Sequence, residues 1–188
     1  MNKLIVGLDV STSVTGFCVL DSSLGNSQDG SHILHLDRIE FKGSETLWKK
    51  ADKVAESLQD LKAKHHDVVW QLSLEEPLLG FQKGMSSAAT ITTLMRFNGI
   101  VSYIGRNIFG VEPEYISAAH ARKLCGIKMQ RTSVAGMSGK EQVFKYMSEN
   151  DLKHVVWPKK KNGKDVDWSR DATDAYVIAH AASLKGDN

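Results

Sequence analysis

The sequence has few cysteines, no long apolar run and little net charge. Its 188 residues include two cysteines, Cys18 and Cys125, whose separation matches no metal-ligand motif. Cys18 lies in an apolar segment and is expected to be a small buried hydrophobe, which agrees with a reducing cytoplasm. No apolar run approaches the roughly 20 residues that span a bilayer. Because residues 1–3 lead directly into a short strand-like run, we expect no signal peptide and no membrane association.

The net charge of +2 conceals an uneven distribution along the chain. Residues 1–117 carry 11 basic and 14 acidic side chains, residues 118–170 carry 12 and 5, and residues 171–188 carry 1 and 3. A basic segment therefore lies between two acidic ones. This pattern is typical of proteins that bind a polyanion, although an ordinary solvated surface can also produce it.

Hydrophobic periodicity predicts a single α/β domain over residues 1–188. Strands are expected at 3–10, 14–21, 33–41, 68–74 and 113–117. Helices are expected at 44–64, 86–108, 118–124, 138–148 and 169–184, and polar loops at 22–31, 132–139 and 151–168. Three consecutive strands followed by strands that alternate with helices predict an antiparallel meander extended by parallel strands, with helices on the faces.

Two of the expected helices carry more specific predictions. Ser44 is a good N-cap for the first, whose apolar stripe is Leu47, Trp48, Ala51, Val54, Ala55, Leu58 and Leu61. The stretch 86–108 has few charges, so it is either deeply buried or packed on a partner chain. Its small and apolar face is the place where we expect a partner: Ala88, Ala89, Ile91, Leu94, Met95 and Gly99.

Four carboxylates stand at positions where charge is costly or crowded. Asp9 ends the first apolar strand, and Glu75 ends the fourth. Asp171 and Asp174 are three residues apart near the start of the last helix, and this spacing places them on one face. Like charges this close raise one another's pKa unless a cation lies between them. Carboxylates from separate elements are the hard oxygen ligands that Mg²⁺ prefers.

Each carboxylate also has a structural explanation. Asp171 could complement the helix dipole, Asp9 could cap a turn, and Glu75 could form a salt bridge. The four together favour a metal centre. Two such ions about 4 Å apart can activate a water and stabilise the leaving oxygen in phosphodiester cleavage.

The motifs around these carboxylates resemble the RuvC family of Holliday-junction resolvases, within the RNase H-like nucleases. The resemblance rests on Gly7-Leu8-Asp9 with Thr15-Gly16-Phe17, Leu72-Ser73-Leu74-Glu75, Lys140-Glu141-Gln142-Val143 after a Gly/Ser loop, and Asp171-Ala172-Thr173-Asp174-Ala175. Two features depart from the family. Val10-Ser11 replaces the Pro-Gly usual in bacterial members, and Glu76 follows Glu75, which leaves the choice of ligand open, with Glu75 favoured. A viral or otherwise divergent member of the family fits this pattern, and we expect it in the cytoplasm of a bacterium or of a virus-infected host cell.

The resemblance implies an RNase H-like fold with a five-stranded mixed sheet flanked by helices. It implies a homodimeric endodeoxyribonuclease that resolves four-way DNA junctions by paired symmetric nicks, leaving a 5′-phosphate. Two Mg²⁺ ions, replaceable by Mn²⁺, would be held by Asp9, Glu75, Asp171 and Asp174. The candidate DNA contacts are Lys140, Arg122, Lys123, Lys128, Arg131, Phe81 and Lys83.

Three other functions share part of this pattern. A phosphotransferase of the actin and sugar-kinase superfamily also opens with a strand, an Asp and a Ser/Thr-Gly turn, but it needs a second such domain and leaves Asp171 and Asp174 without a role. An RNase H-like nuclease acting on flaps, forks or RNA would have the same metal site. A non-catalytic junction binder predicts that acidic positions are lost, and all four are present.

Overall fold

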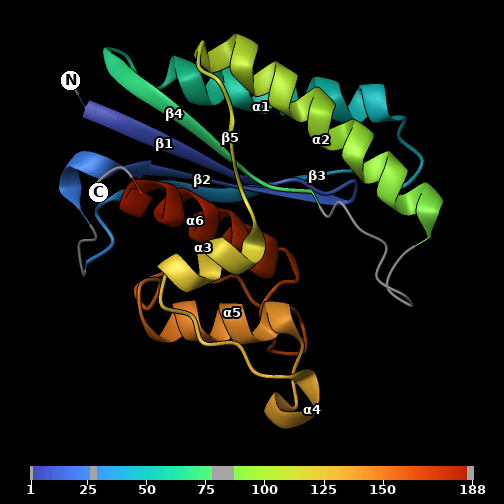
Figure 1. Ribbon diagram of the computed structural model, residues 1–188, viewed down its shortest axis with the longest axis vertical. Coiled ribbons are helices and arrows are strands. Elements are labelled where there is room, and N and C mark those ends of the chain that lie inside the picture. The colour runs from blue at the N-terminus through green and yellow to red at the C-terminus, as the bar shows by residue number, and fades with distance from the viewer. Residues whose placement is uncertain (1, 26–28, 78–86, 186–188) are drawn as a thin grey trace.

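The computed structural model describes residues 2–25, 29–77 and 87–185 (Figure 1). The strands are β1 (Asn2–Asp9), β2 (Val14–Asp21), β3 (Ile33–Glu40), β4 (Val68–Glu75) and β5 (Glu114–Ile116). The helices are η1 (Ser22–Leu24), α1 (Leu47–Ala63), α2 (Ala88–Phe109), α3 (Ala118–Leu124), α4 (Thr132–Ala135), α5 (Gly139–Glu149) and α6 (Trp168–Lys185). Within this described part of the chain, no helix has the length and hydropathy needed to cross a membrane.

The five strands form one sheet in the order β3-β2-β1-β4-β5. The pairs β1–β2 and β2–β3 are antiparallel, and the pairs β1–β4 and β4–β5 are parallel. The predicted meander with parallel extensions is therefore confirmed. It follows from chain order, because β1, β2 and β3 follow one another with no α-helix between them, whereas β4 and β5 are reached through α1 and α2.

Each face of the sheet is covered by its own helical layer and its own core. Side chains alternate along β1, so Leu4, Val6 and Leu8 enter one core with α1 and α2, whereas Ile5 enters the other with α6. Figure 1 shows α1 and α2 on one face, and α6 on the opposite face with α3 and α5 beyond it. The inner core helix α6 is buried along most of its length. Cys18 is fully buried in the α6 core, as predicted.

Helix α6 lies unusually close to the strands because small residues line the contact. A Cβ added at Gly7 would be 2.4 Å from the Ala175 carbonyl oxygen and 2.7 Å from the Ala179 Cβ. At Gly16 it would be 2.1 Å from the Asp171 carbonyl oxygen. The two glycines thus let the helix backbone rest on β1 and β2, and they set the position of the first turns of α6.

Several local predictions need correction. Helix α1 is capped by Thr46, whose hydroxyl accepts from the Lys49 amide at 3.3 Å, and not by Ser44. Trp48 is 71% exposed, because it lies outside the stripe of α1 that faces the sheet. The predicted loop at 132–139 contains the single turn of α4, and the loop at 22–31 begins with η1.

Helix α2 is buried on one face only, where it packs against the sheet and α1. Phe97, Val101 and Phe109 enter the core, whereas Met95 and Tyr103 remain 43% and 65% exposed. A Cβ added at Gly99 would meet no atom within 4 Å, so this position faces open space. The face predicted to meet a partner is therefore a free surface of the monomer.

Candidate active site

Asp9 and Glu75 meet because of strand register. β1 and β4 run parallel with Leu8 paired to Leu74, so the next residue of each strand lies side by side at the carboxyl end of the sheet. Alternation turns both side chains toward the α6 face. The two carboxyl groups lie close enough for the charge of Asp9 to raise the pKa of Glu75. Glu76 follows the end of the strand and is exposed.

Asp171 and Asp174 reach the same place from the first turns of α6. The contact between Gly16 and the Asp171 backbone brings this part of the helix against β2, at the residue that pairs with Asp9. Asp174 is buried, and the side chain of Asp171 is 20% exposed. Three elements that are far apart in the sequence therefore deliver four carboxylates to one edge of the sheet.

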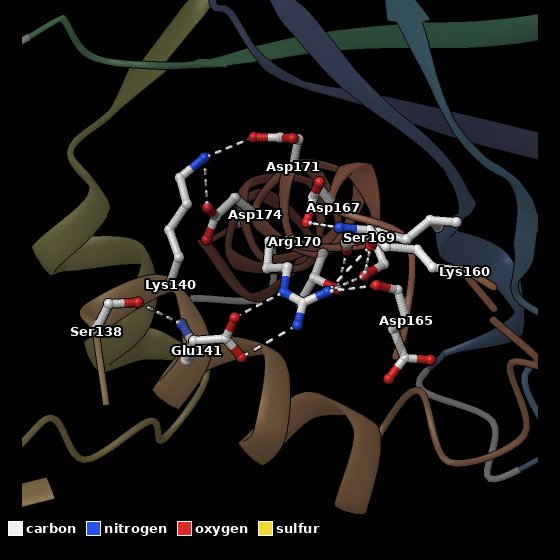
Figure 2. A network of polar contacts seen from close by, with 12 residues as sticks. Ser138, Lys140, Glu141, Lys160, Asp165, Asp167, Ser169, Arg170, Asp171 and Asp174 are labelled. Atoms are coloured by element: carbon white, nitrogen blue, oxygen red, sulfur yellow. Dashed lines mark hydrogen bonds and ion pairs between the residues drawn. The ribbon is translucent and has the colours of Figure 1, made fainter. Parts of the chain in front are cut away.

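The ammonium of Lys140 lies among these carboxylates. Its Nζ is 2.7 Å from Asp171 Oδ1, 3.3 Å from Asp9 Oδ2 and 3.3 Å from Asp174 Oδ2. Figure 2 shows the lysine side chain rising from the start of α5 toward Asp171 and Asp174. The resemblance placed Lys140 at the DNA backbone, whereas in this structure it bridges the carboxylate cluster.

A second ion pair holds the start of α5 against the start of α6. Arg170 Nε donates to Glu141 Oε1 at 3.0 Å, and its Nη2 donates to Glu141 Oε2 at 3.3 Å (Figure 2). The Ser138 hydroxyl caps α5 by accepting from the Glu141 amide. Because Glu141 and Arg170 are the direct neighbours of Lys140 and Asp171, this pair aligns the two elements that meet at the site. The sequence analysis did not predict this ion pair. The available signal was the presence of opposite charges beside two candidate site residues, Glu141 after Lys140 and Arg170 before Asp171.

Burial and the charges of neighbouring carboxylates raise the pKa of three members of the cluster. Burial, followed by the charges of Asp9 and Asp174, raises the pKa of Glu75 to about 8. Burial and the charge of Asp9 raise the pKa of Asp174 to about 6, against the lowering effect of Lys140 and Arg122. Burial also raises the pKa of Asp9, although Lys140 opposes this. One ammonium does not neutralise the cluster, which therefore favours additional positive charge.

The chemistry of this donor set fits Mg²⁺, because all four side chains present hard oxygen ligands. The raised pKa values of Asp9, Glu75 and Asp174 are the electrostatic sign of a site that a divalent cation would stabilise. Among the described residues, no group of three or more Asp, Glu, His or Cys side chains has the geometry of a metal site. Asp9, Asp171 and Asp174 are arranged around the ammonium of Lys140 instead.

Three of the predicted DNA contacts line one groove beside the cluster. The groove has a volume of about 610 Å³ and lies between α3 and the turn that follows it. Its lining is Ala119, Arg122, Lys123, Gly126, Ile127, Lys128 and Met129. The charge of Arg122 also lowers the pKa of Glu75 and of Asp174, so this side chain links the groove electrostatically to the carboxylate site.

The remaining predicted contacts have different positions. Arg131 precedes α4 as its N-cap residue and is exposed. Phe81 and Lys83 lie outside the described residues. The structure therefore brings together Arg122, Lys123 and Lys128 in the groove, and Lys140 with the four carboxylates.

Known structures share this arrangement of elements over nearly the whole chain. RuvC of Thermus thermophilus in complex with a Holliday junction substrate is 12% identical, with a TM-score of 0.64, over 98% of this chain and 95% of that one. A second structure of Thermus thermophilus RuvC is 15% identical, with a TM-score of 0.57 and the same coverage. The chain has a RuvC-like fold.

A third solved structure, from yeast, is also similar to this chain. The yeast mitochondrial Holliday junction resolvase Ydc2 is 14% identical, with a TM-score of 0.51, over 97% of this chain and 80% of that one. No protein-family model and no curated protein sequence gives a significant match. The likeness is therefore one of three-dimensional structure, and it confirms the predicted resemblance at the level of the fold.

Proposed function

We propose that this protein is a metal-dependent endodeoxyribonuclease that resolves four-way DNA junctions by paired symmetric nicks. The observation that carries the proposal is the convergence of Asp9, Glu75, Asp171 and Asp174 at one edge of a RuvC-like fold. One of the similar structures is Thermus thermophilus RuvC in complex with a Holliday junction substrate, which supports branched DNA as the substrate of this chain.

The four carboxylates would hold two Mg²⁺ ions, and Mn²⁺ could take their place. Bound there, the ions would supply an activated water and stabilise charge on the phosphodiester. Breaking the bond between phosphorus and the 3′ oxygen would leave a 5′-phosphate and a 3′-hydroxyl. The protein contributes the fixed positions of its ligands: Asp9 and Glu75 on adjacent strands, Asp171 and Asp174 on a helix seated against Gly7 and Gly16. This seating matters because in-line attack requires ligands that do not move between ground state and transition state.

Basic side chains beside the site would bind the DNA backbone. Arg122, Lys123 and Lys128 line one groove, Arg122 acts electrostatically on Glu75 and Asp174, and Arg131 follows along the chain. A groove lined by cationic side chains suits a polyanionic strand, and its exposed apolar residue Met129 can contact sugars or bases. Binding through such contacts becomes weaker as salt increases.

A C₂ homodimer would match the two-fold symmetry of the junction and place two sites for paired nicks. The exposed face of α2 is the surface that we assign to this contact. Met95 and Tyr103 present apolar area there, and Gly99 allows a second helix to approach closely. Ala88, Ala89, Ile91 and Leu94 continue the same face toward the start of the helix.

A substrate panel tests the proposal. The purified protein is incubated with labelled four-way junction, flap, linear duplex and RNA/DNA hybrid, in Mg²⁺, Mn²⁺ or EDTA. We expect symmetric nicks in the junction alone, with no cleavage in EDTA. Asp9→Asn should abolish cleavage while it binds junctions at least as tightly, because it removes negative charge beside a phosphate. Asp167→Asn is the matched control, since this side chain is 88% exposed and pairs only with Lys160 among the recorded ion pairs.

Other outcomes assign the protein to another class. Cleavage mainly of flaps, forks or RNA would identify an RNase H-like nuclease of different substrate preference. Tight junction binding without cleavage in any divalent metal would identify a non-catalytic binder. An unfolded Asp9→Asn protein would show that Asp9 has a structural role.

A further inference from the structure

The position of Lys140 is that of a cation held by a carboxylate cage. Its Nζ lies within 3.3 Å of carboxylate oxygens from Asp9, Asp171 and Asp174, and these residues belong to β1 and α6. Three anionic ligands on one ammonium exceed what a surface salt bridge offers. The pKa of Lys140 reflects this setting: burial lowers it, but the charges of Asp9, Asp174 and Asp171 outweigh burial and raise it above its usual value.

The side chain of Lys140 is free to leave this position without disturbing the core. It is 49% exposed, whereas the carboxylates that it contacts are 8–20% exposed. Its backbone is fixed independently, because Ser138 caps α5 and Glu141 pairs with Arg170 (Figure 2). A flexible four-carbon stem on a fixed helix start can therefore exchange its partners by side-chain rotation alone.

We propose that Lys140 is an internal cation that competes with divalent metal ions for the carboxylate cluster. In the metal-free protein its ammonium docks among Asp9, Asp171 and Asp174, and metal binding requires it to leave. This inference rests on the proposed function, because it assumes that the same carboxylates bind metal. It explains why they are arranged around Lys140 and not as a ready metal cage.

Competition has two measurable consequences. Only molecules in which the lysine has left the cluster can bind metal, so the apparent affinity is the intrinsic affinity multiplied by that fraction. If the lysine is docked in about 90% of molecules, metal binding is about tenfold weaker. The metal-free protein, in turn, relies on Lys140 to offset the repulsion among its buried carboxylates. Removing the ammonium should therefore strengthen metal binding and weaken the metal-free fold.

The first experiment follows Lys140 in the wild-type protein. Amine acylation, read residue by residue by mass spectrometry, is measured in EDTA and in saturating Mg²⁺ without DNA. Lys145 is the internal reference, because it lies on the same helix, is exposed and forms none of the recorded ion pairs. We expect the labelling rate of Lys140 to rise about tenfold on adding Mg²⁺ while that of Lys145 stays constant. An unchanged Lys140 rate, with metal binding shown independently, would overturn the proposal.

The second experiment compares Lys140→Gln with Lys145→Gln, which makes the same charge change elsewhere on α5. Calorimetry gives the Mg²⁺ and Mn²⁺ affinities without DNA, and thermal unfolding in EDTA gives the stability. Lys140→Gln should bind metal about tenfold more tightly and unfold at lower temperature in EDTA, whereas Lys145→Gln should match wild type. Equal affinities for wild type and Lys140→Gln would refute competition alone. Failure of both to bind either metal would refute the proposed metal-dependent activity itself.

Discussion

Replacing Gly16 by alanine tests whether the seating of α6 determines the geometry of the site. The added Cβ would lie 2.1 Å from the Asp171 carbonyl oxygen and 2.5 Å from the Asp171 carbonyl carbon. Because these are backbone atoms, no side chain can rotate away to relieve the contact. The helix start must retreat by about 1 Å to reach an ordinary contact. Overpacking of this kind costs about 1–3 kcal/mol, which lowers the Tm of a domain of this size by about 2–10 °C.

The same displacement moves Asp171 and its neighbour Asp174 away from Asp9. A shift of about 1 Å in catalytic ligands can reduce turnover about 100-fold. We therefore expect Gly16→Ala to lose junction cleavage at temperatures where it remains folded. The assays are thermal unfolding by circular dichroism and single-turnover cleavage of a labelled four-way junction well below the Tm. Gly43→Ala is the control, because its Cβ would meet no atom within 4 Å. Wild-type stability and cleavage in Gly16→Ala would refute the reasoning.

Three further predictions concern charge and assembly. Because burial raises the pKa of Glu75 from 4.5 to about 8, the folded protein binds more protons, and the metal-free protein should lose stability as pH rises through this range. Glu75→Gln should flatten this decline in Tm measured in EDTA, and an unchanged slope would contradict it. Arg122→Gln should reduce the salt slope of junction binding by about 1, measured by anisotropy, whereas exposed Lys49→Gln on the opposite layer should not. Met95→Arg should convert a dimer to a monomer in light scattering and paired nicks to single nicks, with Val156→Arg, 92% exposed, as control.

The sheet and the acidic cluster were predictable because they depend on short-range rules. Alternation in β1 and β4 determines which face Asp9 and Glu75 occupy, and helical spacing determines that Asp171 and Asp174 point the same way. Strand adjacency follows from the order of elements. These rules act within a few residues, so a sequence displays them directly.

The position of Lys140 was not predictable in the same way. Its ammonium reaches Asp9 across 131 residues of chain, and no local pattern encodes that distance. The Arg170–Glu141 pair likewise depends on how α5 lies beside α6. For Trp48 the local pattern predicted a buried position that the structure does not have. Helical spacing includes it in the apolar stripe, whereas the packing of α1 on the sheet leaves it exposed. Long-range placement is decided by packing, which periodicity does not specify.

The sheet separates two cores, and this separation bears on which parts of the protein can be altered. All four carboxylates and Lys140 belong to the α6 side of the sheet, whereas α1 and α2 pack against its other face. A combinatorial library that repacks the α1–α2 core should yield many active variants at moderate stability. A library across the Gly7, Gly16 and alanine contacts of α6 should yield almost none. Engineering of thermostability is therefore best directed to the α1–α2 layer.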